Sequence, residues 1–322
     1  MVTFDPAVVS PQLSAPPLVA VVGPTGVGKS ALGFYLARRY RGAIINTDSR
    51  LFYRGMDIGT SKPSTEERSS VLSFLFDLNE PDDSFSLAKF LPLAHQTIQR
   101  VNHRGSLPIL VGGSGQYIWA LLEGWKVSGV PPNPKLRSRL EREAQRLGPD
   151  AIFRRLSEID YEAAARVDPR NLRRLIRAVE VATGRNESGV RVSVKALNLY
   201  RILIIGLAPL SRARLYQDLD VRIDRMLADG WLDEVRILLD KGYNLDLSVF
   251  SSMGYRELAL CLQGELSIEE AATRIRSAHR RLVRRQNTWF KPSDPRIHWL
   301  IADGTESQKA GALLEQFLLR PE

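Results

Sequence analysis

The chain has 322 residues, of which 44% are hydrophobic, a net charge of +9 and a single cysteine. This length is enough for a full hydrophobic core, and one cysteine excludes both an internal disulfide and a cysteine-based metal cluster. No apolar run approaches the roughly twenty residues of a membrane span. The positive charge favours a polyanionic partner.

Residues 1–16 are rich in proline and lack the basic start and continuous apolar centre of a secretion signal. We therefore expect a flexible leader here and a cytoplasmic location.

Apolar runs predict strands at 18–23, 43–48, 74–78, 108–112, 201–207 and 297–301. Most are continuous runs, as is typical of parallel strands covered on both faces, and helical stretches separate them. The pattern predicts an α/β fold, a mostly parallel sheet flanked by helices. Between 125 and 199 a proline-rich start precedes segments rich in Arg, Glu and Ala, so we expect an inserted helical domain there. The catalytic core would then comprise 17–124 and 200–322.

The first strand leads directly into the sequence GPTGVGKS, which has the GxxxxGK[ST] spacing of a phosphate-binding loop, or P-loop. Glycines let backbone N–H groups converge on an anion, and the positive end of the following helix points toward it. The sequence thus predicts a P-loop NTPase-like core that binds a di- or triphosphate, with Ser30 placed to hold Mg²⁺ as cofactor. The predicted diphosphate-binding residues are Gly23, Pro24, Thr25, Gly26, Val27, Gly28, Lys29 and Ser30.

A P-loop hydrolase also needs a carboxylate at the end of a second buried strand. The strands at 108–112 and 201–207 lead into glycine and carry no acid, whereas Asp48 ends the strand at 43–48. Because parallel strands place their carboxyl ends at one crevice, Asp48 should face whatever Lys29 holds. This arrangement favours group transfer to a second substrate over hydrolysis.

The segment 274–285, RIRSAHRRLVRR, contains six arginines and no acid. On a helix these arginines occupy about half of the circumference, while Ala271, Ile275, Ala278, Leu282 and Trp289 share the other side. Arginine offers forked donors that suit phosphate, so the cationic face predicts contact with nucleic acid.

Six segments together resemble one family. They are GPTGVGKS, INTDSRLFYRGMDIGTSKP at 45–63, LVGGSGQYIWALLEG at 110–124, RRLIRAVEV at 173–181, SSMGYREL at 251–258 and RRQNTWF at 284–290. In this order they are similar to the bacterial tRNA dimethylallyltransferases, also called tRNA isopentenyltransferases.

The resemblance implies transfer of a dimethylallyl group from dimethylallyl diphosphate to N6 of adenosine 37, in the anticodon stem-loop of tRNAs that read codons starting with U. It implies that the P-loop binds the prenyl diphosphate, that Asp48 is the general base, and that Lys29 and Arg222 assist the leaving pyrophosphate. A monomer is the state that the family suggests.

The resemblance also assigns tRNA contacts to several segments. In this numbering they are Asp48, Ser49, Arg50, Leu51, Ser114, Arg137, Arg173, Arg174, Leu175, Ile176, Arg177, Ser251, Ser252, Met253, Gly254, Tyr255, Arg256, Arg284, Arg285, Gln286, Asn287, Thr288, Trp289, Phe290 and Lys291. The chain departs from the common family pattern at Leu51, at 73–78 and at Asp218.

Two other functions share part of this pattern. A small-molecule kinase would also have a P-loop and an acid after its second strand, but it would not need the arginine helix. An RNA-binding protein that senses nucleotide through its P-loop would leave Asp48 without a role.

Overall fold

The computed structural model describes residues 15–125, 127–188 and 199–319. The chain divides into two compact units, one of 1–124 with 196–322 and the other of 125–195. Residues 1–14 of the expected leader and 189–198 of the expected insertion lie outside the described residues.

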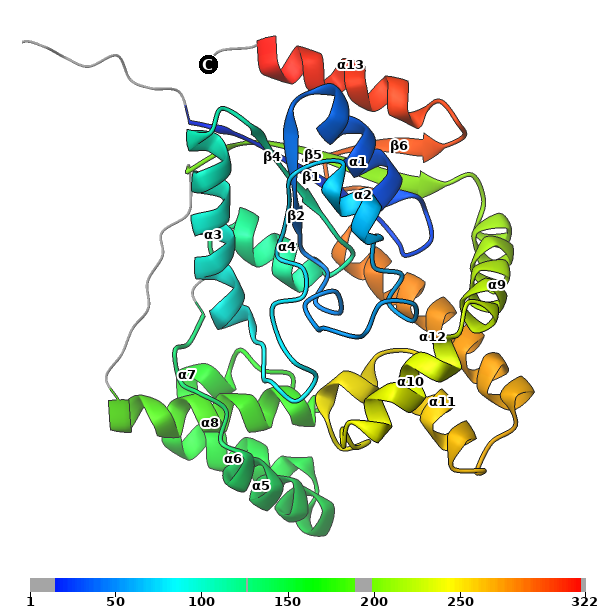
Figure 1. The fold of residues 1–322 in the computed structure, drawn as a ribbon. Coiled ribbons are helices and arrows are strands. Elements are labelled where there is room, and N and C mark those ends of the chain that lie inside the picture. Colours follow the sequence, from blue (N-terminus) through cyan, green and yellow to red (C-terminus); the bar gives the residue numbers. More distant parts are fainter. Residues whose placement is uncertain (1–14, 126, 189–198, 320–322) are drawn as a thin grey trace, which may run out of the picture. The chain divides into compact units, whose positions relative to one another are not determined.

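The first unit is built on a six-stranded parallel sheet in the order β3-β2-β4-β1-β5-β6 (Figure 1). Its central strands, β1, β2 and β4, are almost entirely buried, because each is a continuous apolar run between two layers of helices. The strands are β1 Pro17–Val22, β2 Gly42–Asn46, β3 Ser73–Phe74, β4 Leu107–Val111, β5 Arg201–Pro209 and β6 Ile297–Ala302.

Alternate residues of the strands form a core with α1 and α13, which pack against each other on one face of the sheet. Helices α3 and α4 pack together, and α3 contacts β2 and β4. The helices of this unit are α1 Lys29–Arg39, α2 Thr65–Ser69, α3 Leu87–His103, α4 Gly115–Leu122, α9 Arg212–Ala228, α10 Trp231–Asp240, α11 Tyr255–Leu262, α12 Ile268–Trp289 and α13 Glu306–Leu319, with a 3₁₀ turn at Ser248–Ser251.

The third strand differs from the prediction. We expected it at 74–78, but it ends at Phe74, and Leu75 and Asp77 then take left-handed backbone conformations with φ of 63° and 51°. Tertiary bonds explain the change, because the Leu75 carbonyl accepts a hydrogen bond from Asn46 and Asp77 pairs with Lys62 and Arg68. These contacts turn the segment toward the end of β2.

The second unit is helical, as the sequence predicts. It contains α5 Pro134–Leu147, α6 Pro149–Ile159, α7 Tyr161–Ala164 and α8 Leu172–Ser188. These helices have a small apolar core of their own, centred on Leu140, Ile152, Leu156, Leu175 and Val179. In the described ranges of both units, no helix is both long and apolar enough to cross a membrane.

Candidate active site

The P-loop lies at the carboxyl end of β1 and wraps the start of α1. Gly28 caps α1 with φ of 97°, a conformation that costs glycine little, so that Lys29 and Ser30 open the helix. The loop lines a cavity of about 280 Å³ together with Asp48 and Arg222. Lys29, Asp48 and Arg222, which are far apart in the sequence, thus meet at one cavity. The strand pattern predicts the first two at a shared crevice, and the family resemblance adds Arg222.

Lys29 is poised for an anion. Its ammonium donates to the Pro24 carbonyl at 2.7 Å. Burial lowers the pKa of Lys29 to about 8, with Asp48 opposing this effect and Arg222 adding to it. The lining contains three cationic residues, Lys29, Lys62 and Arg222, and two acidic ones, Asp48 and Glu67. This leaves an excess of positive charge that suits a phosphate ligand.

Arg222 projects from α9 and is fixed by a hydrogen bond from its Nε to Ser61 Oγ at 2.9 Å. Burial lowers the pKa of this guanidinium as well, while the nearby Asp48 opposes the decrease. Ser61 itself has a left-handed backbone, with φ of 50°. Such a conformation is rare outside glycine and persists where surrounding contacts impose it.

Asp48 lies at the end of β2, where Asn46 fixes the backbone. The fully buried Asn46 accepts a hydrogen bond from the Asp48 N–H at 2.8 Å and donates to the carbonyls of Asp48 and Leu75. One oxygen of the Asp48 carboxylate accepts the Arg50 N–H at 3.1 Å. The carboxylate is therefore held at the cavity by local turn geometry.

A second cavity, of about 290 Å³, also has Asp48 in its lining. Its other walls come from the loops after β2 and β4, the start of α4, the region of the 3₁₀ turn and the end of α12. They include Ser114, Tyr117, Ser251, Arg285 and Trp289. Burial raises the pKa of Tyr117 to about 12, so this phenol stays protonated at neutral pH. Asp48 is thus shared by two cavities, with the P-loop lining one and many of the expected tRNA contacts lining the other.

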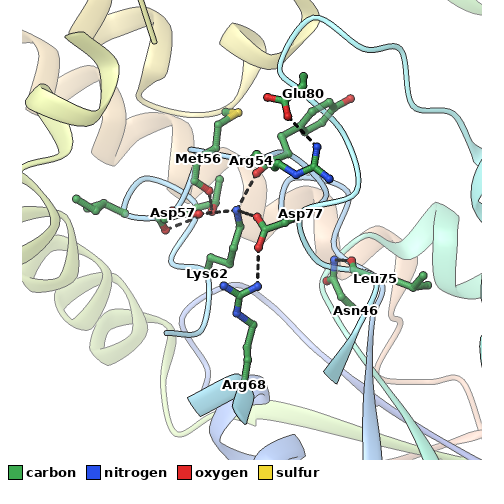
Figure 2. A network of polar contacts seen from close by, with 12 residues as sticks. Asn46, Arg54, Met56, Asp57, Lys62, Arg68, Leu75, Asp77 and Glu80 are labelled. Carbon is green, nitrogen blue, oxygen red and sulfur yellow. Dashed lines mark hydrogen bonds and ion pairs between the residues drawn. The ribbon is translucent and has the colours of Figure 1, made fainter. Parts of the chain in front are cut away.

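The loop 53–62, which carries the sequence RGMDIGTSK and is called the signature loop, contains a lysine that was not among the predicted site residues. The Lys62 side chain is only 1% exposed, and its ammonium bonds to Asp57 at 2.5 Å, Asp77 at 2.6 Å and the Tyr53 carbonyl at 2.7 Å. Figure 2 shows Asp77 continuing the network to Arg68. Burial acts to raise the pKa of Asp77, but the hydrogen bonds from Lys62 and Arg68 outweigh it and hold the pKa below its usual range.

The same loop also binds a carboxylate from α10. Glu234 accepts hydrogen bonds from the backbone N–H groups of Asp57, Ile58 and Gly59, at 2.7–3.2 Å, and from the Tyr255 hydroxyl at 2.6 Å. Four donors on one carboxylate fix the loop that carries Ser61. No sequence motif points to Glu234, because three of its four partners are backbone amides.

Several expected tRNA contacts have side chains in the protein interior. In the first unit Tyr255 and Phe290 are at most 2% exposed, and Ser252, Gly254 and Gln286 are also buried. The exposed members of the same segments are Ser251, Arg256, Arg284, Arg285, Asn287, Thr288 and Lys291. The remaining expected contacts in the first unit, Ser49, Arg50, Leu51, Ser114, Met253 and Trp289, are half-buried and line one of the two cavities.

The arginine face of α12 is partly neutralised. Arg280 pairs with Asp220 at 2.6 Å and lies over the Tyr216 ring, and Arg276 pairs with Asp224, both acids being on α9. Arg281, Arg284 and Arg285 are exposed and make no ion pair with any described residue. Together with Arg274, which is also exposed and makes no ion pair with a described residue, these arginines are the part of the predicted cationic face that is available to a partner.

In the second unit the buried Glu180 binds two of the expected tRNA contacts. Arg137 donates to Glu180 through Nε and Nη2 at 3.0 and 2.9 Å, and Arg177 donates to Glu180 and to the Val130 carbonyl. Leu175 and Ile176 lie in the core of this unit, whereas Arg173 and Arg174 are exposed at the start of α8.

The site fits a magnesium ion in part. Ser30 is exposed on the first turn of α1 and lines the P-loop cavity, so its hydroxyl and the oxygens of a bound diphosphate provide hard ligands. Over the described ranges there is no group of three His, Cys, Asp or Glu side chains that could hold a metal by itself. A metal at this site would therefore bind together with the diphosphate.

Comparisons with known proteins agree with these observations. Residues 51–293 match the family model described as IPP transferase. A tRNA dimethylallyltransferase of Roseiflexus sp. is 44% identical over 94% of this chain and 99% of its own length, and that of Roseiflexus castenholzii is 46% identical over 93% and 98%.

Solved structures give the same result. A tRNA isopentenylpyrophosphate transferase from Bacillus halodurans superposes with a TM-score of 0.69 at 34% identity, covering 94% of this chain and 96% of that one. A eukaryotic dimethylallyltransferase acting on tRNA superposes with a TM-score of 0.77 at 25% identity, covering 95% and 80%. The matched segments include the P-loop, the signature loop and α12, and the chain accordingly belongs to the IPP transferase family, together with the tRNA dimethylallyltransferases.

Proposed function

We propose that the chain transfers a dimethylallyl group from dimethylallyl diphosphate to N6 of adenosine 37 in tRNAs reading codons that start with U. The observation that carries the proposal is the position of Asp48, which lines both the P-loop cavity and the cavity beside α12. A carboxylate between a diphosphate site and a nucleobase site is what a proton-removing transferase needs. The family suggests that the enzyme acts as a cytoplasmic monomer.

The donor diphosphate binds at the P-loop amides, with Lys29 and Arg222 beside it. Both cations stabilise the negative charge that develops on pyrophosphate as the allylic C–O bond breaks. Bound Mg²⁺, held by Ser30 and the diphosphate oxygens, would neutralise further charge on the leaving group.

The acceptor base enters from the second cavity. An adenine in an anticodon loop must leave its stack to reach the half-buried Asp48 carboxylate. The second cavity has Tyr117 and Trp289 in its lining, which offer aromatic surface to the base. The N6 nitrogen forms the new bond to C1 of the prenyl group and gives its proton to Asp48, while the electrons of the broken C–O bond leave on pyrophosphate.

A double-label assay tests the proposal. The protein is incubated with tRNA and either prenyl-labelled dimethylallyl diphosphate or γ-labelled ATP. We expect prenyl label in the tRNA anticodon loop and no movement of phosphate label. Transfer of the ATP label to a small molecule would favour the kinase alternative and refute the proposal.

The role of Asp48 is tested by Asp48→Asn, which keeps the side-chain volume but removes the base. We expect turnover to fall by about 10²–10⁴-fold, while tRNA binding stays within a few-fold of wild type. Near-normal turnover would show that another group takes the proton.

A further inference from the structure

Gln286 lies in the last turns of α12, within a segment that the family resemblance connects with tRNA. Its neighbours Arg284, Arg285 and Asn287 are exposed, but Gln286 itself is only 5% exposed. Both ends of its amide are used inside the protein. The side-chain oxygen accepts the Thr25 N–H at 2.8 Å, and the side-chain nitrogen donates to the Gly113 carbonyl at 3.1 Å.

These two partners belong to different parts of the candidate site. Thr25 is in the P-loop, and Gly113 follows β4 next to Asp48. A methyl group on Gly113 would lie 3.6 Å from the Asp48 carboxylate, and one on Gly112 would lie 2.7 Å from the Asp48 nitrogen. Gln286 therefore connects the loop that binds the diphosphate to the glycine pair against which Asp48 packs.

The glycine at 113 makes this connection possible. A Cβ atom there would lie 2.3 Å from the Gln286 side-chain nitrogen, closer than side chains approach one another. The GGSG and RRQNTWF segments thus fit together, and the indole nitrogen of Trp119 on α4 reinforces the contact by donating to the Trp289 carbonyl at 2.9 Å.

The geometry points to Gln286 as a positioning residue that fixes the P-loop with respect to Asp48. Its loss would leave the Thr25 N–H without its partner in a partly buried setting, where an unpaired donor is unfavourable. The loop would then shift to recover a hydrogen bond, and displacements of about 1 Å can lower rates about 100-fold. The consequence for transfer rests on the proposed function, whereas the consequence for diphosphate binding does not.

The first test replaces Gln286 with methionine, which has similar length and volume but no amide. Inorganic pyrophosphate with Mg²⁺ serves as the probe, because it needs the P-loop and no tRNA. We expect Gln286→Met to raise the pyrophosphate Kd by about 10-fold and to lower kcat/KM for the donor at saturating tRNA by about 10- to 100-fold, with the tRNA Kd within about twofold of wild type. A raised tRNA Kd with unchanged pyrophosphate affinity would overturn the inference and make Gln286 an RNA contact.

Gln99→Met provides the matched control, since Gln99 is an exposed glutamine on α3, away from both cavities. It should leave all three constants unchanged. If circular dichroism shows that Gln286→Met does not fold, Gly113→Ala replaces it as the test. This variant retains the Gln286 amide, but its added methyl group displaces the amide from its position. An unchanged pyrophosphate Kd in Gly113→Ala would then refute the positioning role.

A double-mutant cycle gives the sharpest test. If Gly113→Ala acts by displacing Gln286, it should weaken pyrophosphate binding in the wild type and add no further loss to Gln286→Met. Additive losses would overturn the inference. A wild-type protein that binds pyrophosphate but transfers no prenyl group would refute the proposed function, and the cycle would still decide the role of Gln286.

Discussion

The charge of Lys29 should lower the free energy of unfolding of the ligand-free protein, compared with an uncharged side chain at the same position. Burial lowers the pKa of Lys29 from 10.5 to about 8, which means that the folded protein binds this proton less tightly than the unfolded chain does. At about 1.4 kcal/mol for each tenfold change in proton affinity, the unfavourable free energy at neutral pH is at most about 3.5 kcal/mol. The side chain is only half-buried and donates to the Pro24 carbonyl, so we expect about 1–2 kcal/mol.

Lys29→Met should therefore raise the free energy of unfolding by about 1–2 kcal/mol at pH 7, measured by urea titration without phosphate. The sign follows from proton linkage. Below pH 8 both states of the wild type carry the proton, and the full unfavourable term is present. Between pH 8 and 10.5 the unfolded chain binds more protons than the folded protein, so wild-type stability rises with pH.

The stability gain of Lys29→Met over the wild type should therefore fall to about half its pH 7 value or less at pH 9.5. Lys241→Met, at an exposed lysine after α10, is the control and should change stability by less than about 0.5 kcal/mol at both pH values. A methionine variant that is less stable than wild type at pH 7, or whose advantage does not depend on pH, would refute the reasoning. Adding pyrophosphate should stabilise the wild type and leave the variant nearly unaffected.

Three further predictions concern the donor, the RNA and the signature loop. Because Lys29 loses its charge near pH 8 in the free protein, kcat/KM for the donor should fall above that pH. Lys29→Arg should remove this alkaline decrease. A wild-type profile that stays flat to pH 9.5 would contradict the role of the Lys29 charge in binding the donor. Replacing Arg281, Arg284 and Arg285, three of the four unpaired arginines of α12, with alanine should weaken tRNA binding. The slope of log K against log salt, measured by filter binding, should fall by about 2–3, and an unchanged slope would show that these arginines do not contact RNA. Glu234→Gln leaves at least one of the four donors to this side chain poorly paired. The variant should lower the free energy of unfolding, measured by urea titration, by about 1–3 kcal/mol. A variant as stable as the wild type would show that the carboxylate does not fix the loop.

The sequence predicts the parts of this protein that depend on local pattern. Continuous apolar runs mark five of the six strands closely, and the P-loop spacing places Lys29 at the start of α1. Asp48 was expected at the same crevice because parallel strands end together, and it does line the P-loop cavity. The third strand was predicted too long, because bonds from Asn46, Lys62 and Arg68 turn the chain after Phe74.

The residues that hold the site in place, and the ion pairs beside it, could not be predicted from local sequence pattern. The family resemblance places Gln286 among the RNA contacts, and only the structure shows that its amide faces Thr25 and Gly113, more than 170 residues away. The arginine run of α12 likewise looked uniform, but Asp220 and Asp224 on α9 neutralise two of its members. Such pairings join residues that are far apart in the sequence, and no local pattern around either partner predicts them.

The position of Gln286 on α12 makes the length of that helix as important as its composition. Successive residues of an α-helix are about 100° apart around its axis. One residue inserted between Ala271 and Gln286 would rotate everything after it by that angle, so that the amide would point away from the P-loop and a different side chain would face it. Surface residues of this helix can therefore change without moving the amide, whereas an insertion or deletion within it would displace the exposed arginines and disturb the donor site in a single step.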